Sequence, residues 1–532
     1  MLRIGRGVYT KNIRSDAIGH LEEPIRLCSS NLSQIKGLQD ITVPSYDRQR
    51  VRPGILNLGL RDFHRVHNAV YFDKLLHIPG NQLWGILSVG TDDSQKKSCS
   101  ELKLQDGLYT VVSKRPDGKS KLRVVGSILD CFHAQSDSRR ASELISGNDT
   151  RIVTLTIKES NYFFDRDFTR FNLNHPSVRH DLMTSGTSKP ARTPVGMLVA
   201  GLYGRYKKKG HPLTVLSCDN LIRNGEITRI MVETYALHRY PLETDFHRWI
   251  STSVFYPNTM CDRICLTDPS EDRIAIQQLL GIRDNALLTT ESFKEWVVEK
   301  WMGNKPDGLE EVGIKMVGST VPYENLKIRL NYGTRLSIGI IGKALGYHTF
   351  EEALEDNSMK RFATQYMTEV EPGLGQTPSD ITIDEYKRHM LERISTPQLK
   401  YQTHRVVEDA SKKLKMDWQP VLQSLPAGSP MRMMGFTIAA WAHLLSESAL
   451  ARAHGSKVMP VVDVGGENLE RVAKNAIANP SGVDSEKAVK DFLSHVFANG
   501  LTFLTPLYQE VLLALRDFEK YGIKESLVKV CN

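Results

Sequence analysis

The chain has 532 residues, of which 40% are hydrophobic and 24% are charged, a composition typical of folded proteins with more than one domain. Its 69 basic and 61 acidic residues give a net charge of +8, which is mild for this length. The basic runs are short and contain no aromatic residues, so we expect no nucleic-acid partner. No apolar run reaches the ~18 residues that a membrane span needs, so we expect no membrane segment.

The seven cysteines are dispersed along the chain, and none belongs to a Cys-x-x-Cys pair. Cys261 and Cys265 are the closest two, but no histidine or cysteine with zinc-ligand spacing accompanies them. An odd, dispersed set of thiols is typical of a reducing compartment, where cysteines pack as small apolar side chains. We therefore expect no metal site.

The N-terminal stretch, residues 1–14, contains four basic residues and no acidic residue. This bias is typical of an organelle transit peptide, and a disordered tail is the other interpretation. The stretch lacks the apolar block of a secretory signal. We expect residues 1–29 to be a leader or a disordered tail, and the protein to be cytoplasmic, with a mitochondrial location as the alternative.

Residues 54–60 form a short apolar run with a glycine near its end, and residues 61–76 follow with apolar side chains near helical spacing. Strand, glycine turn and helix begin a dinucleotide-binding βα unit, in which free N–H groups of the helix hold a pyrophosphate. Arg61 stands where the second glycine of the fingerprint is expected, so it either blocks the pyrophosphate or pairs with it. The candidate cofactor-binding residues here are Leu58, Gly59, Phe63, His64 and Arg65.

A second apolar run, residues 84–90, is followed by Asp92 and Asp93. An acidic residue roughly 20–30 positions after the glycine turn suits the hydroxyl groups of an adenosine ribose and favours NAD over NADP. A plain aspartate turn is the alternative interpretation. We include Asp92 and Asp93 among the cofactor-binding candidates and expect NAD.

Short β-branched runs alternate with helical patterns through the rest of this half of the chain. The expected strands are residues 108–112, 122–130, 151–157 and 213–221, and the expected helix is 194–206. Alternation of this kind predicts an α/β domain with a mostly parallel sheet, whose ligands lie beyond the carboxyl ends of the strands. Asn220 and Asn224 stand at such an end.

The second half of the chain has few strand signals and several long helical patterns, so we expect a mainly α-helical C-terminal domain. Two glycines and a proline within residues 313–322 mark a boundary. The expected domains are residues 30–315, a Rossmann-type dinucleotide-binding domain, and residues 316–532, a helical substrate and catalytic domain.

Residues 326–338 place Lys327, Asn331, Tyr332 and Arg335 close together, just before an apolar run that reads as a buried helix. A lysine beside polar hydrogen-bonding groups at the mouth of a buried helix is a candidate for proton transfer. By itself the pattern fits a solvated surface lysine equally well, because lysine is seldom fully buried.

Several motifs in order resemble one known family. They are YDR at residues 46–48, GLRDFHRVHNAVYFDKLL from residue 59, LSCDNLIRNG at 216–225, FYPNTMCDRI at 255–264 and LKIRLNYGT at 326–334. The sequence resembles the polyol-specific long-chain dehydrogenases, the mannitol dehydrogenase and fructuronate reductase family. The resemblance implies a Rossmann-type domain, a helical domain, an active site between them, and metal-free hydride transfer between a nicotinamide cofactor and a secondary alcohol. We expect a mannitol-like polyol and a fructose-like ketose as substrates of a monomer or homodimer.

The resemblance also implies roles for individual residues. Lys327 falls on the family's general base, and Asn220 on the asparagine that holds the reacting oxygen. The implied substrate-binding residues are Asp262, Arg405 and Lys413. From the residues alone, Asn220 reads as a strand-end turn residue, Asp262 as an ion-pair partner of Arg263, and the last two as a solvated helix face.

The sequence departs from the family pattern K-x4-N-x2-H after the lysine. Tyr332 takes the fifth position and Arg335 the eighth. Three outcomes stay open. In the first, Asn331 holds the reacting oxygen of the substrate in place of the family asparagine. On an unbroken helix Asn331 shares a face with Lys327 and Arg335, and Tyr332 lies about 100° away. Alternatively, Tyr332 and Arg335 supply the donors, with Arg335 favouring an acidic or phosphorylated substrate. In the third, catalysis is lost and a pseudo-enzyme serves as a binding or structural subunit.

Overall fold

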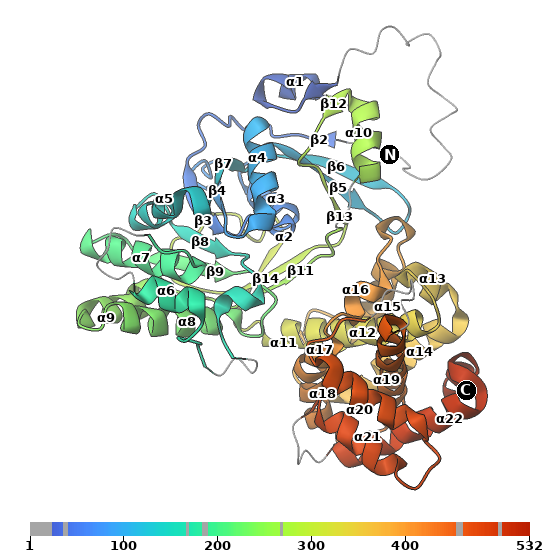
Figure 1. Cartoon of the computed structure of the whole chain (residues 1–532). Helices are drawn as coiled ribbons and strands as arrows, with labels where there is room; N and C mark the ends of the chain where they lie inside the picture. The colour runs from blue at the N-terminus through green and yellow to red at the C-terminus, as the bar shows by residue number, and fades with distance from the viewer. Residues whose placement is uncertain are drawn as a thin grey trace, which may run out of the picture. The chain divides into compact units, whose positions relative to one another are not determined.

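The structure is a computed structural model, and it describes residues 24–35, 41–165, 170–183, 190–266, 270–453, 461–497 and 503–532. The chain forms two compact units, Met1–Thr320 and Val321–Asn532 (Figure 1). The predicted boundary between residues 315 and 316 lies a few residues before this division. Most of the predicted leader, residues 1–23, lies outside the described residues.

The core of the first unit is a six-stranded, entirely parallel sheet in the order β10-β9-β8-β3-β4-β7. The strands are β3 (Pro53–Leu58), β4 (Gly85–Gly90), β7 (Ile128–His133), β8 (Ile152–Leu155), β9 (Leu213–Ser217) and β10 (Val254–Phe255). The chain runs outward from β3 through β4 to β7, then returns to β8 on the other side of β3. The strand order therefore reverses between β3 and β8, which is where sheets of this kind bind ligands.

Helices cover both faces of this sheet, as Figure 1 shows. The helices are α2 (Asp62–Val66), α3 (Asn68–Leu75), α4 (Lys96–Leu104), α5 (Ala134–Ser146), α6 (Pro176–Met183), α7 (Pro194–Lys207), α8 (Asn224–Arg239) and α9 (Thr244–Ser253). Successive strand residues enter different apolar clusters: Ile55 packs with α3, whereas Leu56 packs with α5 and α7. This alternation is the two-residue period of a strand that is buried on both faces.

Smaller sheets complete the first unit. A four-stranded sheet has the order β13-β5-β6-β2, with an antiparallel β5–β6 hairpin; a three-stranded sheet has the order β11-β14-β15; and β1 pairs with β12. Their bounds are β1 (Ile25–Arg26), β2 (Ile41–Thr42), β5 (Tyr109–Lys114), β6 (Ser120–Val125), β11 (Thr259–Asp262), β12 (Ile282–Arg283), β13 (Leu288–Glu291), β14 (Glu295–Glu299) and β15 (Ile314–Val317). Helix α1 (Leu32–Ile35) and helix α10 (Ser270–Leu280) flank them.

The expected single strand over residues 122–130 is wrong, because β6 and β7 divide it between two sheets. The break falls at Gly126, whose N–H donates to Asp73 Oδ1 at 2.9 Å. A side chain at this position would lie 2.7 Å from Pro44, so glycine allows the two segments to pack this closely.

The second unit is helical throughout its described residues, apart from an isolated bridge between Thr349 and Gln402. Its α-helices are α11 (Val321–Glu324), α12 (Gly333–Ala344), α13 (Phe350–Glu355), α14 (Asn357–Val370), α15 (Ile383–Ile394), α16 (Thr403–Val407), α17 (Ala410–Lys413), α18 (Gln419–Ser424), α19 (Arg432–Ala453), α20 (Gly466–Ala478), α21 (Ser485–Ser494) and α22 (Leu504–Val530). Two π-helical turns, η5 (Asn325–Tyr332) and η8 (Leu414–Trp418), interrupt the α-helical winding. In the described part of the chain, no helix has the length and apolarity to cross a bilayer.

Candidate functional site

The turn after β3 lies at the point where the strand order reverses. Gly59 has φ +99°, and a side chain on it would lie 2.1 Å from the main-chain oxygen of Thr156. The Thr156 hydroxyl donates to the Gly59 oxygen at 2.5 Å. Only glycine permits this close approach, which ties the carboxyl end of β3 to that of β8.

Arg61 stands just before α2 and turns toward the end of β9. Its guanidinium lies 3.7 Å from Asp219 Oδ1, and its side chain is 38% exposed. This ion pair is a third arrangement, which the two sequence-based alternatives for Arg61 did not include. The guanidinium of Arg61 stays partly exposed, two residues after Gly59.

Asp219 is the anchor at the ends of β8 and β9. Its carboxylate accepts hydrogen bonds from Ile157 N at 2.9 Å, Lys158 N at 3.2 Å and the Tyr162 hydroxyl at 3.0 Å. Burial raises the pKa of Asp219 to about 6, although these bonds and the charge of Arg61 oppose the shift. This role was not predicted from the sequence, where its only local signal was the aspartate inside the SCDN motif.

Asn220 follows this anchor and its side chain is exposed. The other asparagines of the two motifs hold the surrounding backbone. The amide of Asn224 donates to Ser217 O at 3.1 Å and to Thr259 O at 3.0 Å, which joins the end of β9 to β11. Asn258 Oδ1 accepts Gly225 N at 2.9 Å, at the start of α8. Much of the motif therefore serves to fix the short loop that carries Asn220.

Asp262 is buried at the end of β11, paired in register with Glu295 of β14. The guanidinium of Arg263 donates to the main-chain oxygen of Glu291 at 3.0 Å and to the Ser113 hydroxyl at 3.0 Å.

Asp92 follows β4, the strand next to β3, as the sequence predicted. Its carboxylate accepts Ser94 N at 3.0 Å and lies 3.2 Å from the ammonium of Lys158. Burial pushes the pKa of Asp92 upward, but the Ser94 hydroxyl and Lys158 outweigh burial and leave the pKa below its ordinary value. Asp93 is more exposed and pairs with Lys96 at 3.0 Å.

Lys158 is a second residue that the sequence analysis missed. Its main-chain N–H donates to Asp219 while its ammonium reaches Asp92, so it links the end of β8 to the end of β4. Its φ is +74°, a conformation that non-glycine residues rarely adopt. Strained backbone of this kind is held by its surroundings and gathers at functional sites.

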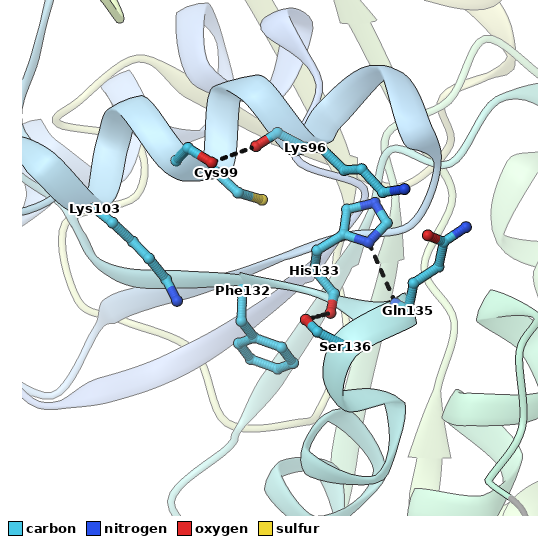
Figure 2. A pocket seen from close by; sticks show the side chains of 8 residues that line it. Lys96, Cys99, Lys103, Phe132, His133, Gln135 and Ser136 are labelled. Carbon is cyan, nitrogen blue, oxygen red and sulfur yellow. Dashed lines mark hydrogen bonds between the residues drawn. The ribbon is translucent and has the colours of Figure 1, made fainter.

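A cavity of about 530 Å³ lies between α4 and the start of α5 (Figure 2). Its walls are α4, which supplies Lys96, Cys99 and Lys103, and the junction of β7 and α5, which supplies Phe132 and His133. His133 Nε2 hydrogen-bonds to the main-chain oxygen of Asp92 at 2.8 Å, so the cavity and the aspartate belong to one region of the domain.

The remaining candidate cofactor-binding residues differ in how deeply their side chains are buried. Leu58 is fully buried at the end of β3, and Phe63 is partly buried and stacks on His67 with ring centroids 4.9 Å apart. His64 is buried against the Ser88 hydroxyl at 3.2 Å, and burial lowers the pKa of its imidazole to about 3. Arg65 is buried and donates to Ala286 O at 3.0 Å. The last two face the interior of the domain and hold the helix in place.

In the second unit, Lys327 lies within the π-helical turn η5 and is only 6% exposed. Helix α11, the turn η5 and helix α12 follow one another as one continuous helical segment. A π-helical turn closes its hydrogen bonds to the fifth residue, and turns of this kind are frequent at functional sites. Here the fifth residue after Lys327 is Tyr332.

The expected separation of about 100° between Tyr332 and Lys327 assumed α-helical winding, whereas residues 325–332 are π-helical. The Lys327 ammonium lies 5.4 Å from the centroid of the Tyr332 ring, and the Arg335 guanidinium lies 5.2 Å from the same centroid. Asn331 is 1% exposed, and its Oδ1 accepts no hydrogen bond from any described residue. Tyr332 thus stands between two cations, beside a buried amide.

Arg335, Lys413 and Arg405 are the remaining candidate residues of this unit. The Arg335 guanidinium donates to the Tyr401 hydroxyl and lies 4.9 Å from the Tyr401 ring centroid. Lys413 donates to Val406 O at 2.8 Å, and burial lowers the pKa of its ammonium, with a further small effect from Arg335. Arg405 lies on α16 with an exposed side chain.

No group of three or more metal-ligating side chains occurs among the residues that the structure describes. The site residues are instead amides, hydroxyls, carboxylates and cations. A parallel sheet in this strand order, with a glycine turn at the reversal and an aspartate after the neighbouring strand, defines a Rossmann-type dinucleotide-binding protein. In this protein it is followed by a helical unit.

Comparison with known proteins identifies the family. Residues 53–308 match the Mannitol dehydrogenase Rossmann domain, and residues 319–511 match the Mannitol dehydrogenase C-terminal domain. The mannitol 2-dehydrogenase of Emericella nidulans is 34% identical over 514 residues, covering 95% of this chain and 99% of that protein. That of Aspergillus clavatus is 32% identical with the same coverage. The chain belongs to the mannitol dehydrogenase family, which confirms the resemblance seen in the sequence.

Two solved structures match most of the chain. The Pseudomonas fluorescens mannitol 2-dehydrogenase in ternary complex with NAD and D-mannitol has a TM-score of 0.80 at 27% identity, covering 95% of this chain and 99% of that one. A substrate-free D-sorbitol dehydrogenase also has a TM-score of 0.80 at 27% identity, covering 94% and 100%. These matches confirm the predicted fold class, a Rossmann domain followed by a helical domain.

Proposed function

We propose that the protein is an NAD-dependent dehydrogenase that interconverts a mannitol-like polyol and a fructose-like ketose, with Lys327 as the general base. Family membership and the names of its relatives support the reaction class. The observation that carries the catalytic part is the burial of Lys327 in a π-helical turn that turns the fifth residue toward it.

Lys327 accepts the proton of the substrate hydroxyl in this proposal. A lysine does this when its ammonium is poorly solvated, and Lys327 is 6% exposed. The aromatic ring and hydroxyl of Tyr332 occupy the position where the family pattern has an asparagine. We assign the Tyr332 hydroxyl as a donor to the oxygen on which charge develops, with the Asn331 amide as the alternative donor.

Asn220 is proposed as a second amide donor to that oxygen, carried on the loop that Asp219 and Asn224 fix. The polyol chain beyond the reacting carbon requires further hydrogen-bonding groups, for which we propose Asp262, Arg335, Arg405 and Lys413. Because Arg335 replaces a family histidine with a permanent charge, we expect it to favour substrates that carry an acidic group at that end.

The residues around the glycine turn fit NAD. The Gly59 turn leaves the end of β3 free of side chain, and the Asp92 carboxylate, whose pKa is lowered, suits two ribose hydroxyls and repels a 2′-phosphate. Asp93 and Phe63 flank these positions, and Arg61 and Lys158 supply positive charge for a pyrophosphate. When bound, NAD accepts or returns the hydride.

We also propose residues 30–315 and 316–532 as the functional domains, a monomer or homodimer as the active form, and a cytoplasmic location, with a mitochondrial location as the alternative. These proposals rest on the sequence and on the family.

An activity screen with a cofactor-binding measurement tests the proposal. Purified protein is titrated with NADH by quenching of its tryptophan fluorescence. It is then assayed with polyols and NAD and with ketoses and NADH, including D-mannitol, D-fructose and analogues that carry an acidic group. We expect micromolar binding and turnover in both directions. Binding without turnover on any polyol or ketose favours the pseudo-enzyme alternative, and absence of binding at millimolar NADH contradicts the dehydrogenase assignment.

A further inference from the structure

The first unit contains a second cavity, of about 430 Å³, between α3 and the β5–β6 hairpin. Its lining includes six basic side chains and no acidic one: Lys74, Arg115, Lys121, Arg123, Arg263 and Lys294. Lys74 lies in the last turn of α3, at the other end of the α2–α3 stretch from the Gly59 turn. The cavity shares no lining residue with the set proposed to hold NAD.

Three of the six cations already have partners within the protein. Arg123 pairs with Asp73 at 2.8 Å, and Arg115 lies 3.3 Å from Asp117. Arg263 donates to main-chain oxygens of Val66 and Glu291. These contacts fix the walls of the cavity.

The other three are lysines, namely Lys74, Lys121 and Lys294. Among the residues that the structure describes, no carboxylate lies within 4.0 Å of their ammonium groups. Lys74 and Lys121 leave a positive potential in the cavity that the enclosing walls strengthen, and Lys294 adds a third charge when it is protonated.

Lys74 and Lys294 also oppose one another directly. The ammonium of Lys294 lies 3.7 Å from the centroid of the Tyr71 ring, which holds it in place beside Lys74. Burial, and then the nearby charge of Lys74, lower the pKa of Lys294 to about 6, and burial also lowers the pKa of Lys74. Two lysines held together in this way disfavour each other's charge unless an anion joins them.

We propose that this cavity binds a phosphate group, either as inorganic phosphate or as the phosphate ester of a small molecule, between Lys74 and Lys294. The hydroxyls of Ser113 and Ser292 line the same cavity and supply neutral donors. Lysine is a common point-charge ligand of phosphate, and the volume leaves room for an organic group beyond it. The site goes beyond the proposed dehydrogenase function and stands without it.

Thermal unfolding and calorimetry of the full chain test the proposal, with inorganic phosphate as the probe and sodium chloride at equal ionic strength as the control. We expect phosphate to raise Tm and to bind with one site per chain, while chloride does neither. Glucose 6-phosphate and glucose form a second pair of probes. Tighter binding of glucose 6-phosphate identifies an ester as the ligand, and equal or weaker binding identifies inorganic phosphate. Equal responses to phosphate and chloride overturn the proposal.

The decisive variant is Lys294→Met, which removes one of the two opposed ammonium groups. We expect it to raise Tm in phosphate-free buffer at about pH 5, where Lys294 would be protonated and repel Lys74, and to weaken phosphate binding at least tenfold. A lysine with only a structural role gives the opposite sign, a lower Tm in phosphate-free buffer with phosphate binding retained, and that result overturns the proposal.

A second pair of variants keeps the test independent of folding at position 294. Lys74→Gln with Lys121→Gln removes two charges at the cavity, and Lys474→Gln with Lys487→Gln removes two exposed charges from α20 and α21. We expect only the first pair to weaken phosphate binding, by at least fivefold. Equal weakening by both pairs means that net charge alone attracts phosphate, which overturns the site.

Discussion

The motif residues of the two units differ in what they do in the structure. At the ends of β8 and β9, the motif residues Asp219, Asn224 and Asn258 are all retained, and each bonds main-chain groups of neighbouring segments. In η5 the π-helical winding brings the fifth residue beside Lys327, but that residue is Tyr332. In the first region the side chains of the motifs hold the backbone in place. In the second the helical winding sets which side chain lies beside Lys327.

The largest effect in the first region is expected at Asn220. Asn220→Ala removes a neutral donor from an exposed loop whose backbone is held by other residues, so the fold is expected to persist while kcat falls roughly 100- to 1,000-fold. Steady-state rates and the midpoint of urea unfolding measure the two effects. An unchanged kcat, or loss of kcat together with loss of stability, contradicts the assigned role.

In the second region, Tyr332→Phe tests whether the hydroxyl has taken over from the family asparagine. We expect kcat/KM to fall roughly 10- to 100-fold, because one hydrogen bond to a charged oxygen contributes about 1.5–3 kcal/mol. Tyr332→Asn is expected to recover part of the loss, and Tyr521→Phe on α22 is the control. If Tyr332→Phe keeps full activity while Asn331→Ala does not, the buried amide is the donor instead.

The role of Asp219 in the first region can be tested through the pH dependence of stability. Its pKa is about 6 in the folded chain and ordinarily near 4, so the folded chain holds the proton more tightly than the unfolded chain. The contribution of Asp219 to the free energy of unfolding therefore falls as pH rises from about 4 to about 6, by roughly 3 kcal/mol, and is constant above and below that range.

Asp219→Asn is expected to remove that fall, on top of a pH-independent loss from weaker acceptance of the three donors. Urea unfolding of both proteins at pH 4.5 and pH 7 measures the difference. If the two proteins show the same change between these pH values, Asp219 does not titrate in this range.

Arg61→Ala has the smallest expected effect. The Arg61 guanidinium lowers the pKa of Asp219, so its removal is expected to raise that pKa and move the pH-dependent range of stability upward. The shift is expected to stay below one pH unit, because Arg61 is 38% exposed and solvent screens the pair. Arg50→Ala, which removes a more exposed arginine paired with Asp47, is the control and is expected to leave the range unchanged.

Local sequence patterns predicted more of the structure of the first unit than of the second. The alternation of strands and helices predicted the parallel sheet, and the positions of Gly59 and Asp92 after β3 and β4 followed from the βα pattern. The pairing of Arg61 with Asp219 joins residues far apart in sequence, which no local pattern encodes. The π-helical winding of η5 also escaped prediction, because helix periodicity alone assumes α-helical hydrogen bonding. The contact between the Lys327 ammonium and the Tyr332 ring therefore did not follow from the sequence pattern.

The central claim, that Lys327 is the general base, is tested most directly by single-turnover reduction of D-fructose with NADH in the wild-type protein and in Lys327→Ala. The account predicts NADH binding within about twofold of wild type, hydride transfer slower by roughly 1,000-fold, and partial recovery on addition of a small primary amine. Lys360→Ala, on the exposed face of α14, is expected to match wild type. Hydride transfer at the wild-type rate in Lys327→Ala would contradict the account.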